Sequence, residues 1–193
     1  MYENTGRVSE KMKKKVESYS AGSKFLHWII ALIVITMLSV SFFLDDLPDS
    51  LQGVAFTIHK SLGVTVLVLV LLRLVWLMAF GRPSLPLAMP GWQKKMAHGV
   101  QYSLYVFLLL MPICGWIMST AANRAPMYFG MFSLPIPLVP VNKQLAGFMK
   151  ECHETIAWIL IALIVLHVAG ALKHHFIDKD NVLRRMLWEK KKG

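Results

Sequence analysis

Apolar residues fall into four long runs along this chain, separated by shorter stretches where charged residues, glycine and proline gather. The runs cover about residues 25–44, 54–80, 97–118 and 153–177. A helix needs about 20 residues to cross a hydrocarbon layer of roughly 30 Å, and each run provides them. The pattern therefore predicts an all-α integral membrane protein, a four-helix bundle that occupies residues 25–178.

The stretches between the runs predict where the helices end. The short acidic turn "DDLPDS" follows the first run, and the glycine and prolines of "GRPSLPLAMP" end the second. Residues 119–152 are expected to form one long loop, whose four prolines exclude a regular helix from its middle. Its aromatic residues favour a packed cap over a loose linker: Tyr128, Phe129, Phe132 and Phe148.

Basic residues are unevenly divided between the two ends of the predicted bundle. Of 21 lysines and arginines, 16 lie in the N-terminal tail, the connection between the second and third runs, or the C-terminal part from Lys173 onward. Positive charge near helix ends marks the cytoplasmic side. Residues 1–24 and 179–193 are therefore predicted to be basic cytoplasmic segments, and 119–152 to be periplasmic. The net charge of +10 is therefore explained by membrane topology and by contact of the basic segments with anionic lipid. Nucleic-acid binding is not needed to explain it and is not expected.

Histidines recur at the ends of the apolar runs. His153 and His167 are fourteen residues apart, which places them on nearly one helix face about 21 Å apart. His59 opens the second run at the outer level, and His27 opens the first at the inner level. Matching by depth gives an outer pair, His59 with His153, and an inner pair, His27 with His167. Two imidazoles at one level, on different helices of a bundle, can bind an iron from both sides.

Two alternatives remain open for these histidines. A membrane histidine can simply hydrogen-bond to a neighbouring helix. A zinc site would need about four ligands, or three and a water, and no third ligand is evident at the inner level.

Arg73 follows His59 by fourteen residues, so it shares that helix face at the inner level. A buried arginine needs an anion, and a haem propionate is one. The alternative is that its side chain extends to the cytoplasmic headgroups. Gly63 and Gly170 would let a flat macrocycle approach the backbone near His59 and His167.

The chain resembles the bacterial cytochrome b561 family of four-helix membrane cytochromes. The resemblance rests on the motifs "LHW" at 26–28, "HKSLG" at 59–63, "LLR" at 71–73, "HETIAW" at 153–158, "LHVAGALKHHF" at 166–176 and "KDNVLRRM" at 179–186. It implies a multi-pass protein of the bacterial inner membrane with two non-covalent b haems, bound by His27, His59, His153 and His167. Such a protein would transfer electrons across the membrane between a periplasmic donor and the quinone pool.

The resemblance also suggests an acceptor and a donor. It places a quinone, ubiquinone being expected, near His174, which lies seven residues beyond His167 on nearly the same face; His98 and His175 are weaker candidates. One branch of the family is similar to superoxide:ubiquinone oxidoreductases, and four outer cations would steer that anion: Lys60, Arg124, Lys143 and Lys150.

Two other functions fit the same pattern. The chain could be a haem-bearing anchor subunit that passes electrons to quinone from a partner dehydrogenase or periplasmic protein, or a structural bundle with incidental histidines. Cys114 and Cys152 both fall near the outer face, where a disulfide is possible although the position of Cys114 inside a helix argues against it.

Overall fold

The computed structural model describes residues 18–86 and 88–188. Of the two predicted basic segments, residues 1–17 and 189–193 therefore lie outside the described residues. The elements follow the order α1 (Ala21–Ser41), α2 (Asp49–Phe80), α3 (Gly91–Ala121), β1 (Met127–Tyr128), β2 (Phe132–Ser133), α4 (Lys143–Phe176) and the short 3-10 helix η1 (Arg184–Met186).

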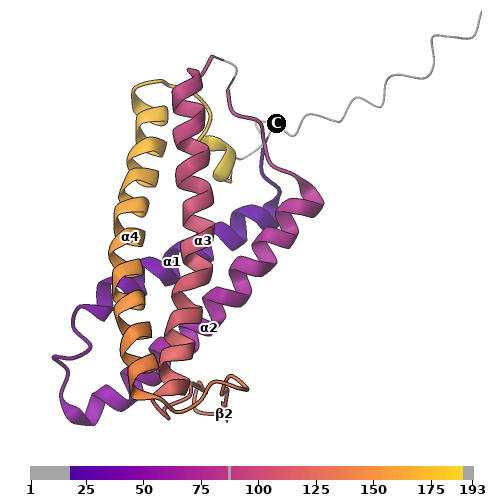
Figure 1. Cartoon of the computed structure of the whole chain (residues 1–193). Coiled ribbons are helices and arrows are strands. Elements are labelled where there is room, and N and C mark those ends of the chain that lie inside the picture. The colour runs from indigo at the N-terminus through magenta and orange to yellow at the C-terminus, as the bar shows by residue number, and fades with distance from the viewer. Residues whose placement is uncertain (1–17, 87, 189–193) are drawn as a thin grey trace, which may run out of the picture.

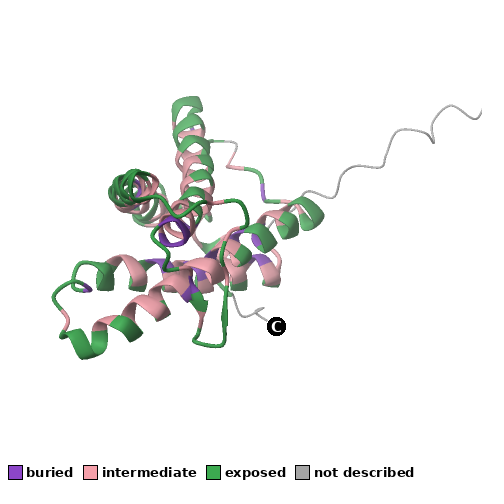
Figure 2. Ribbon diagram, turned by 60° about the horizontal axis from the view of Figure 1, so that its bottom comes forward, coloured by how far each residue is buried: buried purple, intermediate pink, exposed green. Residues whose placement is uncertain are grey.

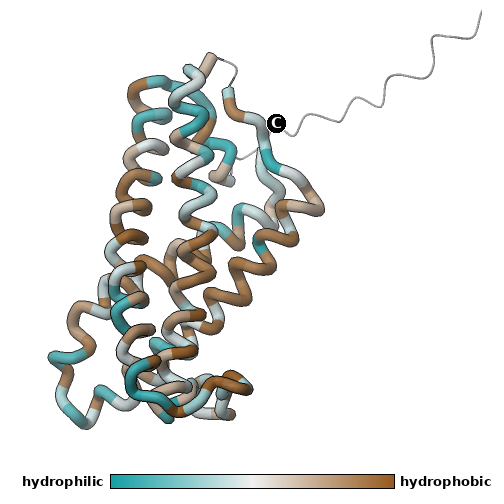
Figure 3. The backbone as a smooth tube through the Cα atoms, in the orientation of Figure 1, coloured by the Kyte–Doolittle hydropathy of each residue, from teal (hydrophilic) through white to brown (hydrophobic). Residues whose placement is uncertain are grey.

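In the described part of the chain, four helices are long and apolar enough to cross a membrane. Apolar residues dominate their middle parts and hydrophilic residues gather toward the ends (Figure 3). Most of the helix surface is exposed or half-buried (Figure 2), as a lipid-facing surface would be in the chain alone. The buried core is small and lies between α1 and α2, where Ile30 and Val34 meet Val66 and Val70.

The helices alternate in direction, so each connection lies at one of two ends (Figure 1). At what we call the terminal end lie the start of α1, the α2–α3 connection and the end of α4. At the loop end lie the α1–α2 turn and the α3–α4 loop. Helix α4 packs along α3, α1 along α2, and α2 against α3, whereas α4 makes no comparable backbone contact with the described residues of α1 or α2.

Helix α3 ends later than its apolar run and α4 begins earlier than its own, which corrects the predicted boundaries of 119–152 and 153–177. Helix α4 begins at Lys143, because the Asn142 side chain caps it by accepting from the amide of Leu145, and α3 continues to Ala121. The loop is therefore residues 122–142. Hydropathy located the part of each helix that suits lipid, whereas capping residues such as Asn142 determine where a helix starts.

The other predicted boundaries shift as well. Helix α1 covers Ala21–Ser41 in place of 25–44, since the Ser20 hydroxyl accepts from the amide of Ser23 at its start. Helix α2 begins at Asp49, directly after Pro48, in place of 54. Helix α3 begins at Gly91, after Pro90, and covers 91–121 in place of 97–118; it continues through Pro112.

The loop folds back onto α2 through a small hairpin of β1 and β2, an element that the all-α prediction did not contain. Ser61, fully buried on α2, accepts from the backbone amide of Phe129 at 2.8 Å. Its hydroxyl also lies 3.2 Å from the carbonyl oxygen of Met127. The loop is therefore a cap held to the bundle by hydrogen bonds.

The C-terminal segment closes the terminal end. Its backbone carbonyls accept hydrogen bonds from the start of the chain: Ser18 donates to Arg185, Trp28 to Met186 and Lys24 to Leu187. The Arg185 guanidinium in turn donates to the carbonyl of Ser84, in the connection between α2 and α3. The segment that follows α4 is thus tied to two other parts of the chain.

Candidate functional site: two facing histidine pairs

The structure brings together the same two histidine pairs that the sequence predicts. At the loop end, the ring centres of His59 on α2 and His153 on α4 are 6.3 Å apart. At the terminal end, the ring centres of His27 on α1 and His167 on α4 are 6.1 Å apart. We call them the loop pair and the terminal pair. In both, the rings are inclined, with interplanar angles of 68° and 63°.

These distances suit a metal bound between two imidazoles. Imidazole nitrogens bind transition metals at about 2 Å, so two such bonds plus the depth of each ring separate the ring centres by about 6 Å. The backbone of α4 stays apart from the backbones of α1 and α2, and the imidazoles meet across this space. Histidine rings that only packed against one another would not need such a separation. Both pairs therefore have the spacing of axial ligand pairs.

The loop pair has an oriented ring. His153 Nδ1 lies 3.0 Å from the carbonyl oxygen of Met111 on α3. Because a carbonyl only accepts, Nδ1 carries the hydrogen and the Nε2 lone pair remains available. Metal-binding histidines commonly donate their second nitrogen in this way, which fixes the ring and makes it a stronger ligand.

Gly115 allows His153 to come this close to α3. A Cβ added at Gly115 would lie 2.9 Å from His153 Cε1 and 3.1 Å from Nδ1. Glycine is required here by contact with the ring, so any side chain at this position would displace the imidazole. The glycines predicted from the sequence were Gly63 and Gly170 instead; a Cβ at Gly63 would approach Met37 only to 4.0 Å, and one at Gly170 would meet no described atom within 4 Å.

A cavity of about 910 Å³ surrounds the loop pair. Its volume is in the upper part of the usual range for cofactor pockets, about 300–1,000 Å³. Both histidines of the pair line it, together with Gly63 and Gly115. The histidines therefore face a space large enough for a cofactor.

The charges that line this cavity nearly balance. Three of the four predicted steering cations contribute to its wall, namely Lys60, Arg124 and Lys150, and so do the carboxylates of Asp45 and Glu154, which leaves a net charge of +1. Lys60 donates to the carbonyl of Arg124 at 2.9 Å, and Lys150 lies 3.5 Å from Glu154. Lys143, the first residue of α4, does not line the cavity.

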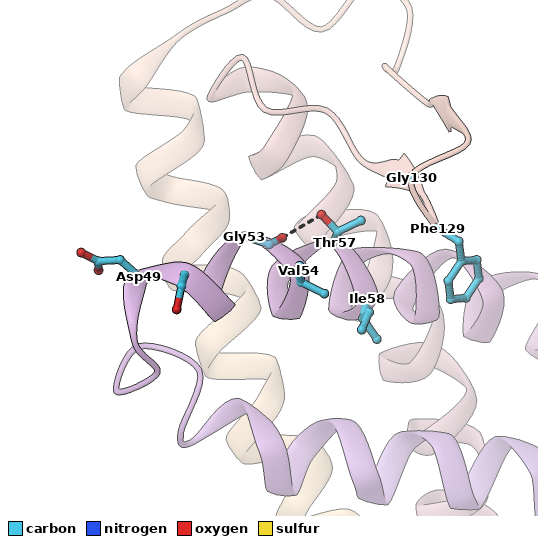
Figure 4. A pocket seen from close by; sticks show the side chains of 8 residues that line it. Asp49, Gly53, Val54, Thr57, Ile58, Phe129 and Gly130 are labelled. Carbon is cyan, nitrogen blue, oxygen red and sulfur yellow. Dashed lines mark hydrogen bonds between the residues drawn. The ribbon is translucent and has the colours of Figure 1, made fainter.

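A second cavity, of about 490 Å³, lies between the start of α2 and the hairpin (Figure 4). Asp49, Val54, Ile58 and Phe129 are among the residues that line it, and the Thr57 hydroxyl there donates to the carbonyl of Gly53. The four paired histidines do not line it, but Gly53 and Thr57 line both cavities, so it adjoins the cavity around the loop pair.

Arg73 lies buried near the terminal pair, only 5% exposed. Its guanidinium donates to the carbonyl of Ser23 on α1 and, at 3.2 Å, to the hydroxyl of Tyr105 on α3. The side chain thus points into the bundle and does not extend to the headgroups. Among the described residues no carboxylate pairs with it, and the Ser23 hydroxyl beside it is buried without a hydrogen-bond partner.

His174 lies at the end of α4, with its side chain 12% exposed. Its Nδ1 lies 2.8 Å from Asp180 Oδ2 and 3.1 Å from Asp178 Oδ2. Of the two weaker candidates, His98 stacks on Tyr102, and His175 Nδ1 is buried without a partner among the described residues. The cysteines Cys114 and Cys152 are free thiols.

Residues 18–189 match the family model described as "Prokaryotic cytochrome b561". The chain belongs to the prokaryotic cytochrome b561 family. Members of this family are membrane proteins that bind b-type haem and carry electrons. The earlier resemblance to this family is thereby confirmed, and the two imidazole pairs give such a haem suitable ligands.

Similar curated proteins differ in what their names say of them. "Cytochrome b561 homolog 2" of Escherichia coli (strain K12) is 34% identical over 89% of this chain and 92% of its own length. "Probable superoxide oxidase CybB" of Yersinia pestis is 29% identical over 94% of this chain and 100% of its own. "Probable Ni/Fe-hydrogenase 1 B-type cytochrome subunit" of E. coli (strain K12) is 23% identical over 88% of this chain and 87% of its own.

Three contributors to the site of this b561-family cytochrome were not predicted from its sequence. Gly115 and the Met111 carbonyl lie on α3, which has no paired histidine to draw attention to it. Asp180 belongs to the motif "KDNVLRRM", in which no residue was assigned a role.

We expect Gly115→Ala to weaken haem retention by about 10–100-fold, the usual effect of disturbing what orients a metal-binding histidine. The measure is haem per polypeptide after purification, with the reduced absorbance spectrum. Gly99→Ala on the same helix is the matched control, since a Cβ there meets no described atom within 4 Å. Equal haem content and spectra in both variants would show that Gly115 does not position His153.

Proposed function

We propose that this b561-family cytochrome binds two b haems per chain, one on the terminal pair and one on the loop pair, and transfers electrons across the membrane from a periplasmic donor to the quinone pool. The observation that carries the proposal is that two imidazole pairs, with ring centres 6.1 Å and 6.3 Å apart, lie toward opposite ends of one bundle. Two redox groups at these depths would form a path through a layer that electrons do not otherwise cross.

Ligation by two histidines determines the kind of chemistry. A b haem supplies a reversible one-electron couple, whose potential the protein sets through axial ligands, hydrogen bonds and burial. If two imidazoles hold the haem, no iron position would be left for a substrate, and substrates would exchange electrons without binding to the iron. The role of His27, His59, His153 and His167 is therefore to hold the group at a fixed depth.

The orientation follows from the positive-inside rule. Among the described residues, the terminal end carries more lysines and arginines than the loop end, so we assign it to the cytoplasm, with both chain termini. The loop end and the hairpin cap then face the periplasm, in the inner membrane of a bacterium. Under this assignment the loop pair receives electrons and the terminal pair delivers them.

Superoxide is the donor that we propose for the loop end. It is a small anion that loses one electron and leaves as dioxygen, so it needs no open position on iron. Lys60, Arg124 and Lys150 on the cavity wall would attract it. The attraction is modest, because Asp45 and Glu154 reduce the net charge of the wall to +1. The similarity to the protein named as a probable superoxide oxidase supports this choice.

Ubiquinone is the acceptor that we propose for the terminal end, close to His174. A quinone becomes a quinol by taking up two electrons and two protons, so two superoxide anions supply the electrons and the cytoplasm supplies the protons. His174 is a group that can pass protons near neutral pH. Its side chain is only 12% exposed and lies at the end of the helix that carries His167.

A second function is favoured by one comparison. The hydrogenase cytochrome subunit that resembles this chain is named as a subunit of a larger enzyme. The hairpin at the loop end exposes Phe129, Met131 and Phe132, which a partner could cover. In this alternative the chain is a haem-bearing anchor, and the electrons come from a partner dehydrogenase or a periplasmic protein.

Mixing the purified protein with superoxide tests the donor directly. Stopped-flow absorbance should show haem reduction that is faster at low salt, since screening has a Debye length of about 10 Å at 0.1 M. The salt effect should be small, because the cavity wall has a net charge of only +1. With ubiquinone added, His174→Ala should slow haem reoxidation by about 10²-fold or more, as expected on loss of a proton donor, and leave haem reduction unchanged. Haem reduction slower than superoxide dismutation would favour the anchor function.

We also propose that Arg73 binds a propionate of the haem on the terminal pair. An anion there would give the buried guanidinium a charged partner and the orphaned Ser23 hydroxyl an acceptor. The fit rests on two hydrogen-bond donors, the Arg73 guanidinium on α2 and the Ser23 hydroxyl on α1. Arg73 also contacts Tyr105 on α3, so the proposed site lies between the three helices.

Arg73→Leu should lower the midpoint potential of one haem, because removing a nearby positive charge favours the oxidised iron. The fall is about 59 mV for each tenfold change in the redox equilibrium. A spectroscopic redox titration measures it, with Arg82→Leu as the control, since Arg82 is exposed and donates to the hydroxyl of Tyr102. An unchanged titration would contradict a propionate contact.

A further inference from the structure

The chain reverses direction directly after α4, and this turn places an aspartate against His174. The helix ends at Phe176, and Lys179 adopts a left-handed backbone conformation with φ 53°. The backbone amide of Asp180 then donates to the carbonyl of His174 at 3.0 Å. The Asp180 carboxylate, in turn, accepts from the His174 ring at 2.8 Å. The two residues are tied through both backbone and side chain.

The two carboxylates next to His174 differ in their other partners. Asp178 has both oxygens engaged by the Lys173 ammonium, at 2.8 Å and 2.6 Å. Asp180 has no such cation among the described residues; its Oδ1 accepts from the backbone amide of Val182 at 2.9 Å. The charge of Asp178 is thus largely offset by Lys173, whereas that of Asp180 is directed at the imidazole by a fixed turn.

This geometry determines which ring nitrogen of His174 is left free of the aspartates. A carboxylate only accepts, so His174 Nδ1 carries a hydrogen and donates it to Asp180. Nε2 is then the nitrogen left to meet a substrate. An imidazolium ring carries a hydrogen on each nitrogen, so it can keep its Nδ1 hydrogen bond to Asp180 and still have a proton on Nε2 to give.

We infer that Asp180 is the positioning residue for proton delivery to quinone: its carboxylate holds the Nδ1–H of His174, so that Nε2 is the ring nitrogen that gives its proton to the substrate. The inference rests on the proposed function, because it assumes that quinone is reduced beside His174.

The proton and electron balance closes with groups already named. The proposed function supplies the electrons. As the quinone takes up an electron, an Nε2–H bond of His174 breaks and an O–H bond of the quinone forms. The imidazole that remains is neutral, and its Nδ1–H still donates a hydrogen bond to Asp180. Water on the cytoplasmic side then returns a proton to Nε2, and a second electron and proton complete the quinol.

Asp180→Asn is the informative variant, because the oxygen of the substituted side chain can still accept from the amide of Val182 and so preserve the turn. The nitrogen of that side chain would donate to His174 Nδ1, and the carboxylate charge would be lost. His174 would then be held as a neutral ring with its hydrogen on Nε2, which it cannot readily release. We expect haem reoxidation by ubiquinone to slow by about 10–100-fold. Reduction of the haems by dithionite, and their spectra and potentials, should match those of the unaltered protein.

Two further variants separate positioning from structural support. Asp178→Asn should change the rate by no more than about twofold, as expected for an exposed ion pair. Asp180→Glu should recover part of the rate, since it restores the carboxylate. Treatment with EDTA should have no effect; loss of activity on chelation would show that the three side chains, whose ligand atoms lie within 4.8 Å of one another, hold a metal, and would overturn the inference.

His174→Ala distinguishes failure of this inference from failure of the proposed function. If His174→Ala slows reoxidation by quinone and Asp180→Asn does not, the positioning role of Asp180 is wrong and the quinone site stands. If neither variant slows it, quinone is reduced elsewhere and both statements fail. Equal slowing in Asp178→Asn and Asp180→Asn would also contradict a specific role for Asp180.

Discussion

The meeting of imidazoles across the bundle is the interaction on which the rest of the structure depends. Helix α4 contributes one histidine to each pair, so a single helix sets both depths at once. It packs along α3 and stays apart from α1 and α2, and side chains alone bridge that separation. A helix keeps its rise and its face over fourteen residues without further support. The separation between the two levels is therefore built into α4, and the other helices only need to present one histidine each.

Each level is then completed by a different kind of support. At the loop end the support is steric and directional: Gly115 leaves room for the His153 ring, and the Met111 carbonyl fixes its tautomer. At the terminal end the support is a set of hydrogen bonds between helices: the buried Arg73 on α2 donates to the carbonyl of Ser23 on α1 and to the hydroxyl of Tyr105 on α3. The C-terminal segment adds a further layer there, since it is tied to the start of α1 and to the α2–α3 connection. The same segment places Asp180 on His174, so the closure of the bundle and the proposed proton path share one short piece of chain.

Hydropathy and histidine spacing were sufficient to predict the four helices and the two pairs, because period and length are properties of the chain itself. Helix ends were less predictable: α4 starts ten residues earlier than its apolar run, at a cap made by Asn142. The hairpin and the buried Ser61 that holds it depend on contacts between distant residues, which no local pattern encodes. Gly115 was missed for the same reason, since its role appears only when His153 is seen beside it. Lys143 was predicted to be a steering cation from its side of the membrane alone; it is the first residue of α4 and does not line the cavity.

The number of haems per chain tests the central claim most directly. A pyridine haemochrome assay on purified protein, with the polypeptide quantified by amino-acid analysis, measures it. The account predicts a ratio that approaches two, and a ratio near one in His153→Ala, because only the loop pair loses a ligand, whereas His167→Ala removes the haem of the terminal pair. A ratio near one in the unaltered protein, or loss of all haem from either variant, would contradict two independent imidazole sites.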